Sequence, residues 1–310
     1  MADPGWAPFL AVVAVLTLAV LGLARQSQSL IREYGPDDEA GDASEADLSD
    51  GDEPDESGGP AELNDAVPET NEALDDRESN VTSSDPGERT PAETRPTGAE
   101  PDIELTTSML LANVAVTQGV VAAIMLVAAW YFSIPADAFG VADTAASIGF
   151  PAVALGAAFG VALWVGNELA TAVADAVGAA YDEAVRRMLA PDSAGGWAVL
   201  LGVVLPIIAL SEELLFRAAL IGVPAAGYGV SPWLLAVVAS VAFALGHGAQ
   251  GRVGVVVTGA LGFVLAAGYI VSGSLLLVIV AHYVINALEF LVHEGLGIDD
   301  VSFGRRIPGV

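Results

Sequence analysis

Long apolar runs constrain what this chain can fold into more than any other feature of its sequence. A membrane-spanning helix needs about 20 mostly apolar residues, and backbone polar groups in lipid must be paired within the segment itself. Both conditions favour helices here. The sequence therefore predicts an all-α, polytopic transmembrane helix bundle of about seven spans, at residues 6–24, 107–132, 147–166, 196–222, 232–249, 253–272 and 274–292.

The chain between the first two runs has the opposite composition. Residues 33–104 are rich in Asp, Glu, Pro, Ser, Thr and Gly, and hold most of the 39 acidic residues. Such a segment cannot bury enough apolar surface to offset the entropy of ordering it. We therefore predict an N-terminal membrane anchor with its juxtamembrane segment at residues 1–32, a disordered acidic linker at 33–104, and a membrane body at 105–310.

The ionisable residues exclude several classes of function. The net charge is −28, all 11 basic residues are Arg, and there is no Cys. A large acidic surplus without Lys is typical of proteins adapted to molar salt, where the Debye length is about 3 Å, and predicts a halophilic archaeal source. The charge argues against nucleic acid as a partner. The absence of Cys excludes disulfides, thiolate metal sites and cysteine nucleophiles.

The positions of the arginines predict the topology. With the N-terminus outside and seven spans, every Arg except Arg217 falls on the cytoplasmic side, and the outer loops near 133–146 and 223–231 hold none. This distribution satisfies the positive-inside rule. It predicts a multi-pass cell-membrane protein with the acidic linker and the C-terminus in the cytoplasm. We also expect the amphipathic stretch from Asn167 to Arg187 to lie on the membrane surface.

Small residues and one proline predict how the helices pack. Pro206 is expected to kink the third run of the body. Two sets of small residues recur at fourfold spacing, which lets membrane helices approach closely. They are Gly156 with Gly160, and Gly254, Thr258, Gly262 and Ala266.

A few ionisable and amide side chains lie inside the apolar runs. Placing a charge at the centre of a membrane costs at least about 2.5–3.5 kcal/mol, so an ionisable residue there is a candidate functional residue. Glu213 and Arg217 are four residues apart and can form a structural ion pair on one helical face. Glu212 points about 100° away from Glu213 and is free to face something else. The remaining side chains of this kind are His247, His282, Asn286 and Glu289.

The last helix carries its polar residues in one stripe. His282 and Asn286 share a face, and Glu289 and His293 continue it. For Glu289 and His293 we favour a structural or interfacial role. One unpaired carboxylate, two imidazoles and an amide on three helices can together activate water against a carbonyl. The carboxylate serves as general base, a His holds the water or shares a metal with it, and the second His and the amide donate to the oxyanion.

Three short motifs resemble those of the CAAX protease and bacteriocin-processing family. Residues 212–217 resemble its E-E-x-x-x-R motif, residues 243–247 its F-x-x-x-H motif, and residues 282–286 its H-x-x-x-N motif. Residues 272–275 are also similar to the family, whereas Ala218 stands where many members have Gly. The resemblance covers residues 195–293.

The resemblance implies that residues 105–310 are an intramembrane-protease domain. It implies an endopeptidase of metallo- or glutamate type that acts on a membrane-associated protein, for which a prenylated CAAX-type protein is one option. Residues matching Glu212 and His247 activate water in this family, those matching His282 and Asn286 stabilise the oxyanion, and the pair matching Glu213 and Arg217 is structural. Glu212, His247 and His282 could also hold Zn²⁺ with one open position. The sequence leaves the metal-dependent and the metal-free mechanism open.

Two other functions compete with the peptidase. One is a catalytically silent binding or scaffold protein that uses the same pocket, and the other is a proton-coupled transporter. All three readings imply membrane lipid as a partner, and the peptidase adds a membrane-anchored protein or peptide substrate. The predicted span boundaries raise a difficulty for the peptidase. They place Glu212 beyond the middle of the membrane and His247 near the cytoplasmic end of the next span, whereas catalysis requires the two to meet.

Overall fold

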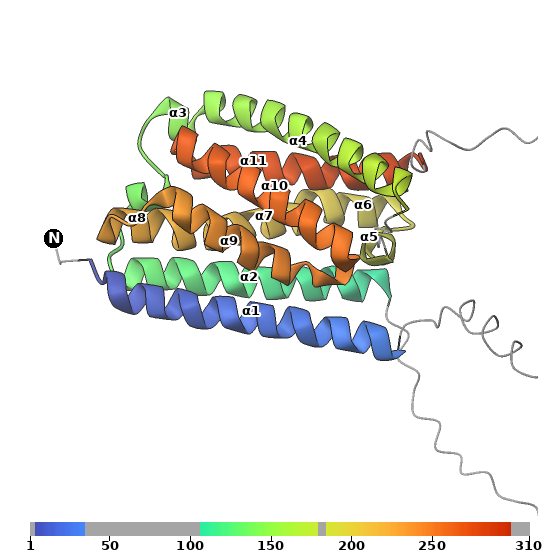
Figure 1. Cartoon of the computed structure of the whole chain (residues 1–310), viewed down its shortest axis with the longest axis horizontal. Coiled ribbons are helices and arrows are strands. Elements are labelled where there is room, and N and C mark those ends of the chain that lie inside the picture. Colours follow the sequence, from blue (N-terminus) through green and yellow to red (C-terminus); the bar gives the residue numbers. More distant parts are fainter. Residues whose placement is uncertain (1–3, 35–105, 179–183, 299–310) are drawn as a thin grey trace, which may run out of the picture. The chain divides into compact units, whose positions relative to one another are not determined.

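The computed structural model describes residues 4–34, 106–178 and 184–298. These residues belong to one compact unit of packed helices, and no strand occurs among them (Figure 1). The all-α prediction is confirmed. The predicted linker lies outside the described residues except for its first two positions, which end the first helix, and Arg305 and Arg306 lie outside them as well.

Six helical stretches in the described part of the chain are long and apolar enough to cross a membrane. They are Trp6–Gln26, Thr107–Tyr131, Phe150–Ala174, Ala194–Tyr228, Gly248–Ser272 and Leu275–Gly295. The helices that carry them are α1 (Trp6–Tyr34), α2 (Thr107–Tyr131), α4 (Phe150–Ala176), the segments from α6 to α8, α10 (Gly251–Ser272) and α11 (Leu275–Glu289). Short elements complete the fold: η1 (Ala136–Phe139), α3 (Ala145–Ile148), α5 (Ala184–Leu189) and η5 (Phe290–Gly295).

The fifth predicted span, at residues 232–249, differs from the structure. Residues 232–249 contain instead a 15-residue helix, α9 (Pro232–Gly246), followed by a turn at η4 (Gly248–Gln250). Fifteen residues rise only about 22 Å, less than the roughly 30 Å of a hydrocarbon core. His247 therefore lies at the end of a helix too short to cross, rather than at the far end of a full span. The helical run that holds Glu212 also extends to Tyr228, beyond its predicted end at 222. Glu212 therefore lies 16 residues before Tyr228, and His247 lies 15 residues after Pro232, so the two reach a similar depth from this end of the bundle.

The stretch Ala194–Tyr228 is one helical run with two π-helical segments. The order is α6 (Ala194–Val199), η2 (Leu200–Val204), α7 (Leu205–Glu213), η3 (Leu214–Gly222) and α8 (Val223–Tyr228), where η2 and η3 are π-helical. Pro206 lies in the first turn of α7, directly after η2, so the irregularity predicted at Pro206 takes the form of a change of helix type. The two adjacent glutamates lie where α7 meets η3.

The stretch from Asn167 to Arg187 was predicted to lie on the membrane surface, but its first part does not form a separate surface helix. Residues up to Ala176 continue α4. The polar side chains there face the bundle, since Asn167 donates to Glu289 at 2.6 Å and Glu168 lies 3.0 Å from His293. The predicted surface location is therefore wrong for this part of the chain. Residues 179–183 lie outside the described ranges.

Close helix contacts at small residues hold α11 in the middle of the bundle. A Cβ atom on Gly156 would lie 2.5 Å from the Leu277 carbonyl oxygen, and one on Gly160 would lie 2.6 Å from that of Ala281. These two glycines let α4 pack directly on α11. The second predicted set, on α10, is buried along its whole length.

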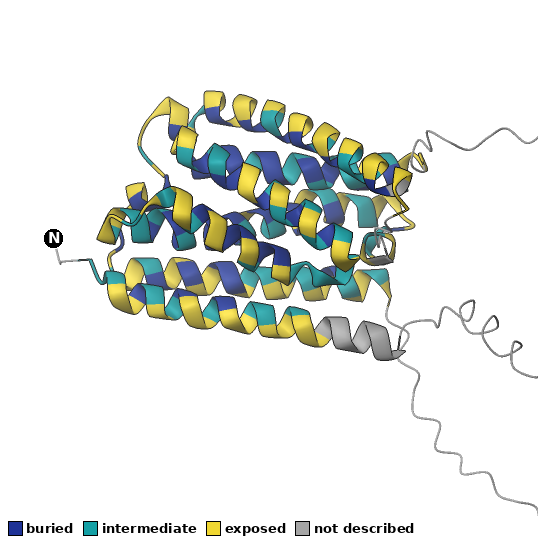
Figure 2. Cartoon of the chain, in the orientation of Figure 1, coloured by how far each residue is buried: buried dark blue, intermediate teal, exposed yellow. Residues whose placement is uncertain are grey.

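The surface of the unit is apolar where lipid would cover it. Exposed residues follow the outward faces of α1, α2 and α4, whereas α7 and α11 are largely buried (Figure 2). Large exposed apolar side chains include Leu18, Val116, Phe150 and Val271. A contiguous apolar exterior of this kind fits a membrane rather than water.

The two ends of the bundle differ as the arginine distribution predicts. The start of α1, α3 and α8 lie at one end, and α5 lies at the other (Figure 1). The loops predicted to be external therefore share one end, opposite Arg186 and Arg187. The orientation of these ends in the membrane stays a prediction.

Candidate active site

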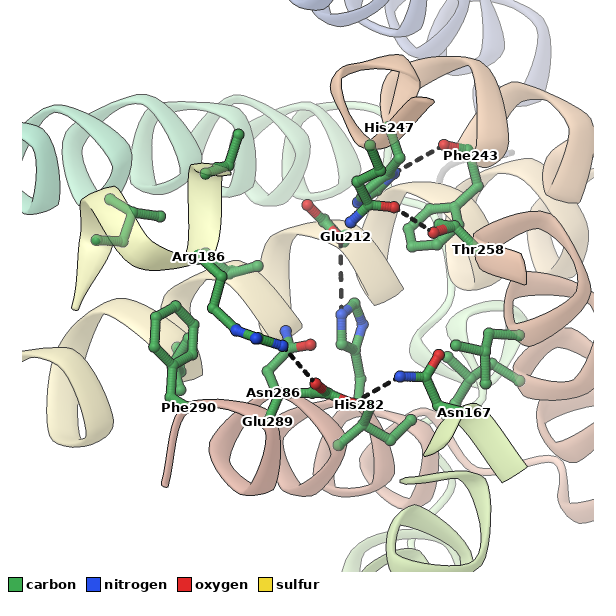
Figure 3. Close-up of a pocket in the computed structure, with 18 of the residues that line it drawn as sticks. Asn167, Arg186, Glu212, Phe243, His247, Thr258, His282, Asn286, Glu289 and Phe290 are labelled. Carbon is green, nitrogen blue, oxygen red and sulfur yellow. Dashed lines mark hydrogen bonds and ion pairs between the residues drawn. The ribbon is translucent and has the colours of Figure 1, made fainter. Parts of the chain in front are cut away.

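Four polar side chains predicted from the sequence line one cavity of about 270 Å³. Glu212 comes from the end of α7, His247 from the turn after α9, and His282 and Asn286 from α11 (Figure 3). Apolar side chains such as Leu205, Ile208 and Leu261 form other parts of the wall. The structure thus brings together groups that are up to 74 residues apart in the sequence.

His247 is held by the last turn of its own helix. Its Nδ1 lies 2.8 Å from the Phe243 carbonyl oxygen, and its ring lies 4.4 Å from the Phe243 ring, centre to centre. A carbonyl oxygen can only accept, so Nδ1 carries the proton in this contact. The neutral ring then presents the Nε2 lone pair, which can accept a proton from water or bind a metal.

Glu212 is the more accessible of the two adjacent glutamates, with 14% of its side chain exposed. Its Oε1 accepts a hydrogen bond of 3.2 Å from Gln118 on α2, and its Oε2 lies 3.7 Å from His282 Nε2. The sequence suggested a carboxylate without a partner. The structure instead gives it an amide partner on one oxygen and leaves the other oxygen facing an imidazole across the cavity.

Glu213 lies on the opposite side of the same turn and is fully buried. Its Oε1 accepts from Arg217 Nη1 at 2.8 Å and lies 2.7 Å from His282 Nδ1. Arg217 is held further by Gly262, whose carbonyl oxygen accepts from Nη2 at 3.1 Å, and by the Phe243 ring, 4.7 Å from the guanidinium carbon. The glutamate expected to serve as structural support therefore also contacts a histidine of the cavity.

The contact with Glu213 sets the proton arrangement of His282. Glu213 Oε1 already accepts a hydrogen bond from the guanidinium of Arg217, so this oxygen also acts as an acceptor toward His282. His282 Nδ1 is therefore the donor, and in the neutral ring Nε2 is an acceptor that faces Glu212. His282 can donate to an oxyanion, as the sequence suggests, only when both of its nitrogens carry protons.

Asn286 lies one turn beyond His282 on α11 and is half-buried in the cavity wall. Its amide makes no hydrogen bond with any residue that the structure describes. The NH₂ group is therefore available to donate into the cavity.

A second polar cluster lies at the end of the same stripe on α11. Glu168, Glu289 and His293 bring their ligand atoms within 4.8 Å of one another, and are the group of three in the described part of the chain that could hold a metal ion. Arg186 already contacts Glu289 at 3.2 Å and Glu294 at 3.0 Å. Because Arg186 and Asn167 already engage the two oxygens of Glu289, an ion-pair cluster at this end of the cavity describes the group better than a metal centre.

Several residues that line the cavity were not predicted from the sequence as site residues. Gln118 is one of two amides in an apolar run, and its partner Glu212 is 94 residues away. Gln250 follows His247 in the turn, and its Oε1 accepts a hydrogen bond of 2.6 Å from Thr258. Nothing in the local pattern separates such amides from ordinary contacts between membrane helices. Asn167 and Arg186 also line the cavity.

Part of the chain is similar to a known family. Residues 194–288 match the family model described as Type II CAAX prenyl endopeptidase Rce1-like. The matched segment contains Glu212, His247, His282 and Asn286, but not Gln118. No curated protein and no solved structure matches the chain. The match covers nearly the same residues as the three motifs and confirms the resemblance that they carry.

Proposed function

We propose that this chain, whose residues 194–288 match the Type II CAAX prenyl endopeptidase Rce1-like family model, hydrolyses a peptide bond of a membrane-associated protein within the bilayer. The family is an intramembrane protease family, and the six apolar helices fit a multi-pass membrane protein. The observation that carries the proposal is the meeting of Glu212, His247, His282 and Asn286 in one cavity.

Glu212 serves as the general base in this proposal. Its Oε2 takes a proton from a water molecule that His247 Nε2 also holds, and the water oxygen attacks the carbonyl carbon of the substrate. The resulting tetrahedral intermediate collapses when Glu212 returns the proton to the amide nitrogen and the C–N bond breaks. General bases of this kind contribute about 100- to 10,000-fold to the rate.

The negative charge on the former carbonyl oxygen needs donors. Asn286 is suited to this role because its amide has no other hydrogen bond in the described residues. His282 joins it when protonated on both nitrogens, since Glu213 already takes the Nδ1 proton. Each such donor stabilises the transition state in an environment where water cannot substitute for it.

A Zn²⁺ ion held by Glu212, His247 and His282 is the metal-dependent alternative, although the ligand atoms of these three do not come within 4.8 Å of one another as those of Glu168, Glu289 and His293 do. Histidines that bind metals commonly donate their other ring nitrogen to a carboxylate or a backbone carbonyl, as His282 does to Glu213 and His247 to Phe243. Glu212, His247 and His282 would hold the ion. A bound zinc would lower the pKa of its water and polarise the substrate carbonyl.

The cavity walls favour a substrate with an apolar attachment near the scissile bond. Leu205, Ile208, Leu261 and Leu265 line the cavity beside the polar groups. A prenylated protein of the CAAX type, whose lipid is attached to a cysteine near the C-terminus, fits this mixture of apolar and polar contacts.

Purified full-length protein in lipid vesicles tests the proposal. We expect it to cleave a prenylated CAAX-type peptide internally, as read by mass spectrometry of both products. Metal content is measured on the same sample, and a chelator arm separates the two mechanisms. A folded protein that binds the peptide without cleaving it would support a silent binding protein instead.

A further inference from the structure

Gln118 contacts the proposed base from a helix outside the segment that matches the family. It lies in the middle of α2, is half-buried, and lines the cavity. Its Nε2 lies 3.2 Å from Glu212 Oε1. Glu212 therefore has one oxygen engaged by an amide and one that faces the cavity.

A buried hydroxyl fixes the orientation of this amide. Ser211 is fully buried, and its Oγ lies 2.5 Å from Gln118 Oε1 and 3.1 Å from the Ile208 carbonyl oxygen. If the amide were rotated by 180°, its oxygen would face the carboxylate of Glu212, and two acceptors would meet at hydrogen-bond distance. Only the orientation with oxygen toward Ser211 and NH₂ toward Glu212 satisfies all three groups.

The arrangement restricts how the carboxylate can rotate. The terminal torsion of a glutamate is broad, so an ionised Glu212 without a partner would sample many planes. The hydrogen bond from Gln118 selects one plane and leaves Oε2 directed toward His282, 3.7 Å away. A base held in one plane meets its water in one geometry, and loss of about 1 Å of positioning can cost about 100-fold in rate.

We propose that Gln118 is a positioning residue for the hydrolysis, acting through Glu212 and itself oriented by Ser211. The inference rests on the proposed role of Glu212 as base. It adds α2 to the functional part of the chain, although this helix lies outside residues 194–288.

A purely structural role makes a different prediction. If the Ser211–Gln118–Glu212 contacts only held α2 against α7, their loss would lower stability and leave the turnover of the folded fraction unchanged. A positioning role lowers kcat in folded protein and leaves KM nearly unchanged, because Gln118 then acts through Glu212 and not through the affinity for substrate. The two roles therefore separate when kcat, KM and thermal unfolding are measured on the same preparation.

The test uses full-length protein in vesicles with the variants Gln118→Met and Ser211→Ala. Methionine keeps the length of the side chain and removes the donor, and Asn113→Leu, at an exposed amide of the same helix, is the matched control. We expect Gln118→Met to lower kcat about 10- to 100-fold with KM nearly unchanged, as for other residues that orient a catalytic group. We expect Asn113→Leu to match wild type.

Ser211→Ala gives a second test that does not depend on how Gln118→Met folds. It should lower kcat by a smaller factor, because the amide can then rotate, and it should have no further effect in a Gln118→Met background. Wild-type kcat in folded Gln118→Met or Ser211→Ala protein, or losses that multiply in the double variant, would overturn the inference alone. A wild-type protein without cleavage would overturn the proposed function, and this inference with it.

Discussion

The imidazole of His282 lies between the two adjacent glutamates, with Nδ1 2.7 Å from Glu213 Oε1 and Nε2 3.7 Å from Glu212 Oε2. One glutamate therefore fixes the proton on the ring, and the other faces the ring nitrogen that remains free. The ion pair of Glu213 with Arg217 consequently supports the cavity directly, and changes in the pair should affect both stability and turnover.

The ion pair is tested by removing its members singly and together. Glu213→Ala and Arg217→Ala each leave a charge unpaired in a buried site, which typically costs about 3–5 kcal/mol. We expect both to lower the thermal unfolding temperature in detergent, and the double variant to lose less than the sum. Arg252→Ala, at an exposed arginine of α10, should change little. Strictly additive losses would show that the two charges do not stabilise each other.

The role of Asn286 can be separated from recognition by kinetics. Removing one oxyanion donor costs about 100- to 1000-fold in turnover. We expect Asn286→Ala to lower kcat by a comparable factor with KM nearly unchanged, and Asn113→Ala on α2 to behave like wild type. An effect confined to KM would assign Asn286 to substrate binding.

The predicted orientation in the membrane is accessible to cysteine labelling, since the chain has no Cys. We expect single cysteines at Ala142 and Tyr228 to react with a membrane-impermeant thiol reagent in intact cells. A cysteine at Ser193, at the other end of the bundle, should react only after the cells are opened. Labelling at Ser193 in intact cells, with protection of the other two, would reverse the predicted orientation.

The sequence predicted the residues of the site better than the helices that hold them. Glu212, His247 and His282 are conspicuous because each is polar within an apolar run. Placing such a side chain in the membrane costs free energy, so its presence there indicates a function. The sequence does not predict the end of α9 correctly, because residues 232–249 are almost entirely apolar and contain no Asp, Glu, Lys or Arg. The glycines at 246, 248 and 251 were the one local indication that the helix stops early.

Contacts between distant segments could not be read from local patterns. Gln118 and Asn167 look like ordinary polar residues of membrane helices, and their contacts are with partners 94 and 122 residues away. The π-helical geometry of Leu214–Gly222 is another such feature, because π-helices are rare and no residue pattern in this stretch indicates one.

The most direct test of the account is the turnover of Glu212→Gln. This change keeps the size of the side chain and removes the group proposed to take the proton from water. We predict that the variant unfolds at the wild-type temperature and binds the prenylated peptide, while its cleavage rate falls at least about 100-fold, within the range of general-base catalysis. A folded Glu212→Gln protein that cleaves at a rate close to that of wild type would contradict the central claim.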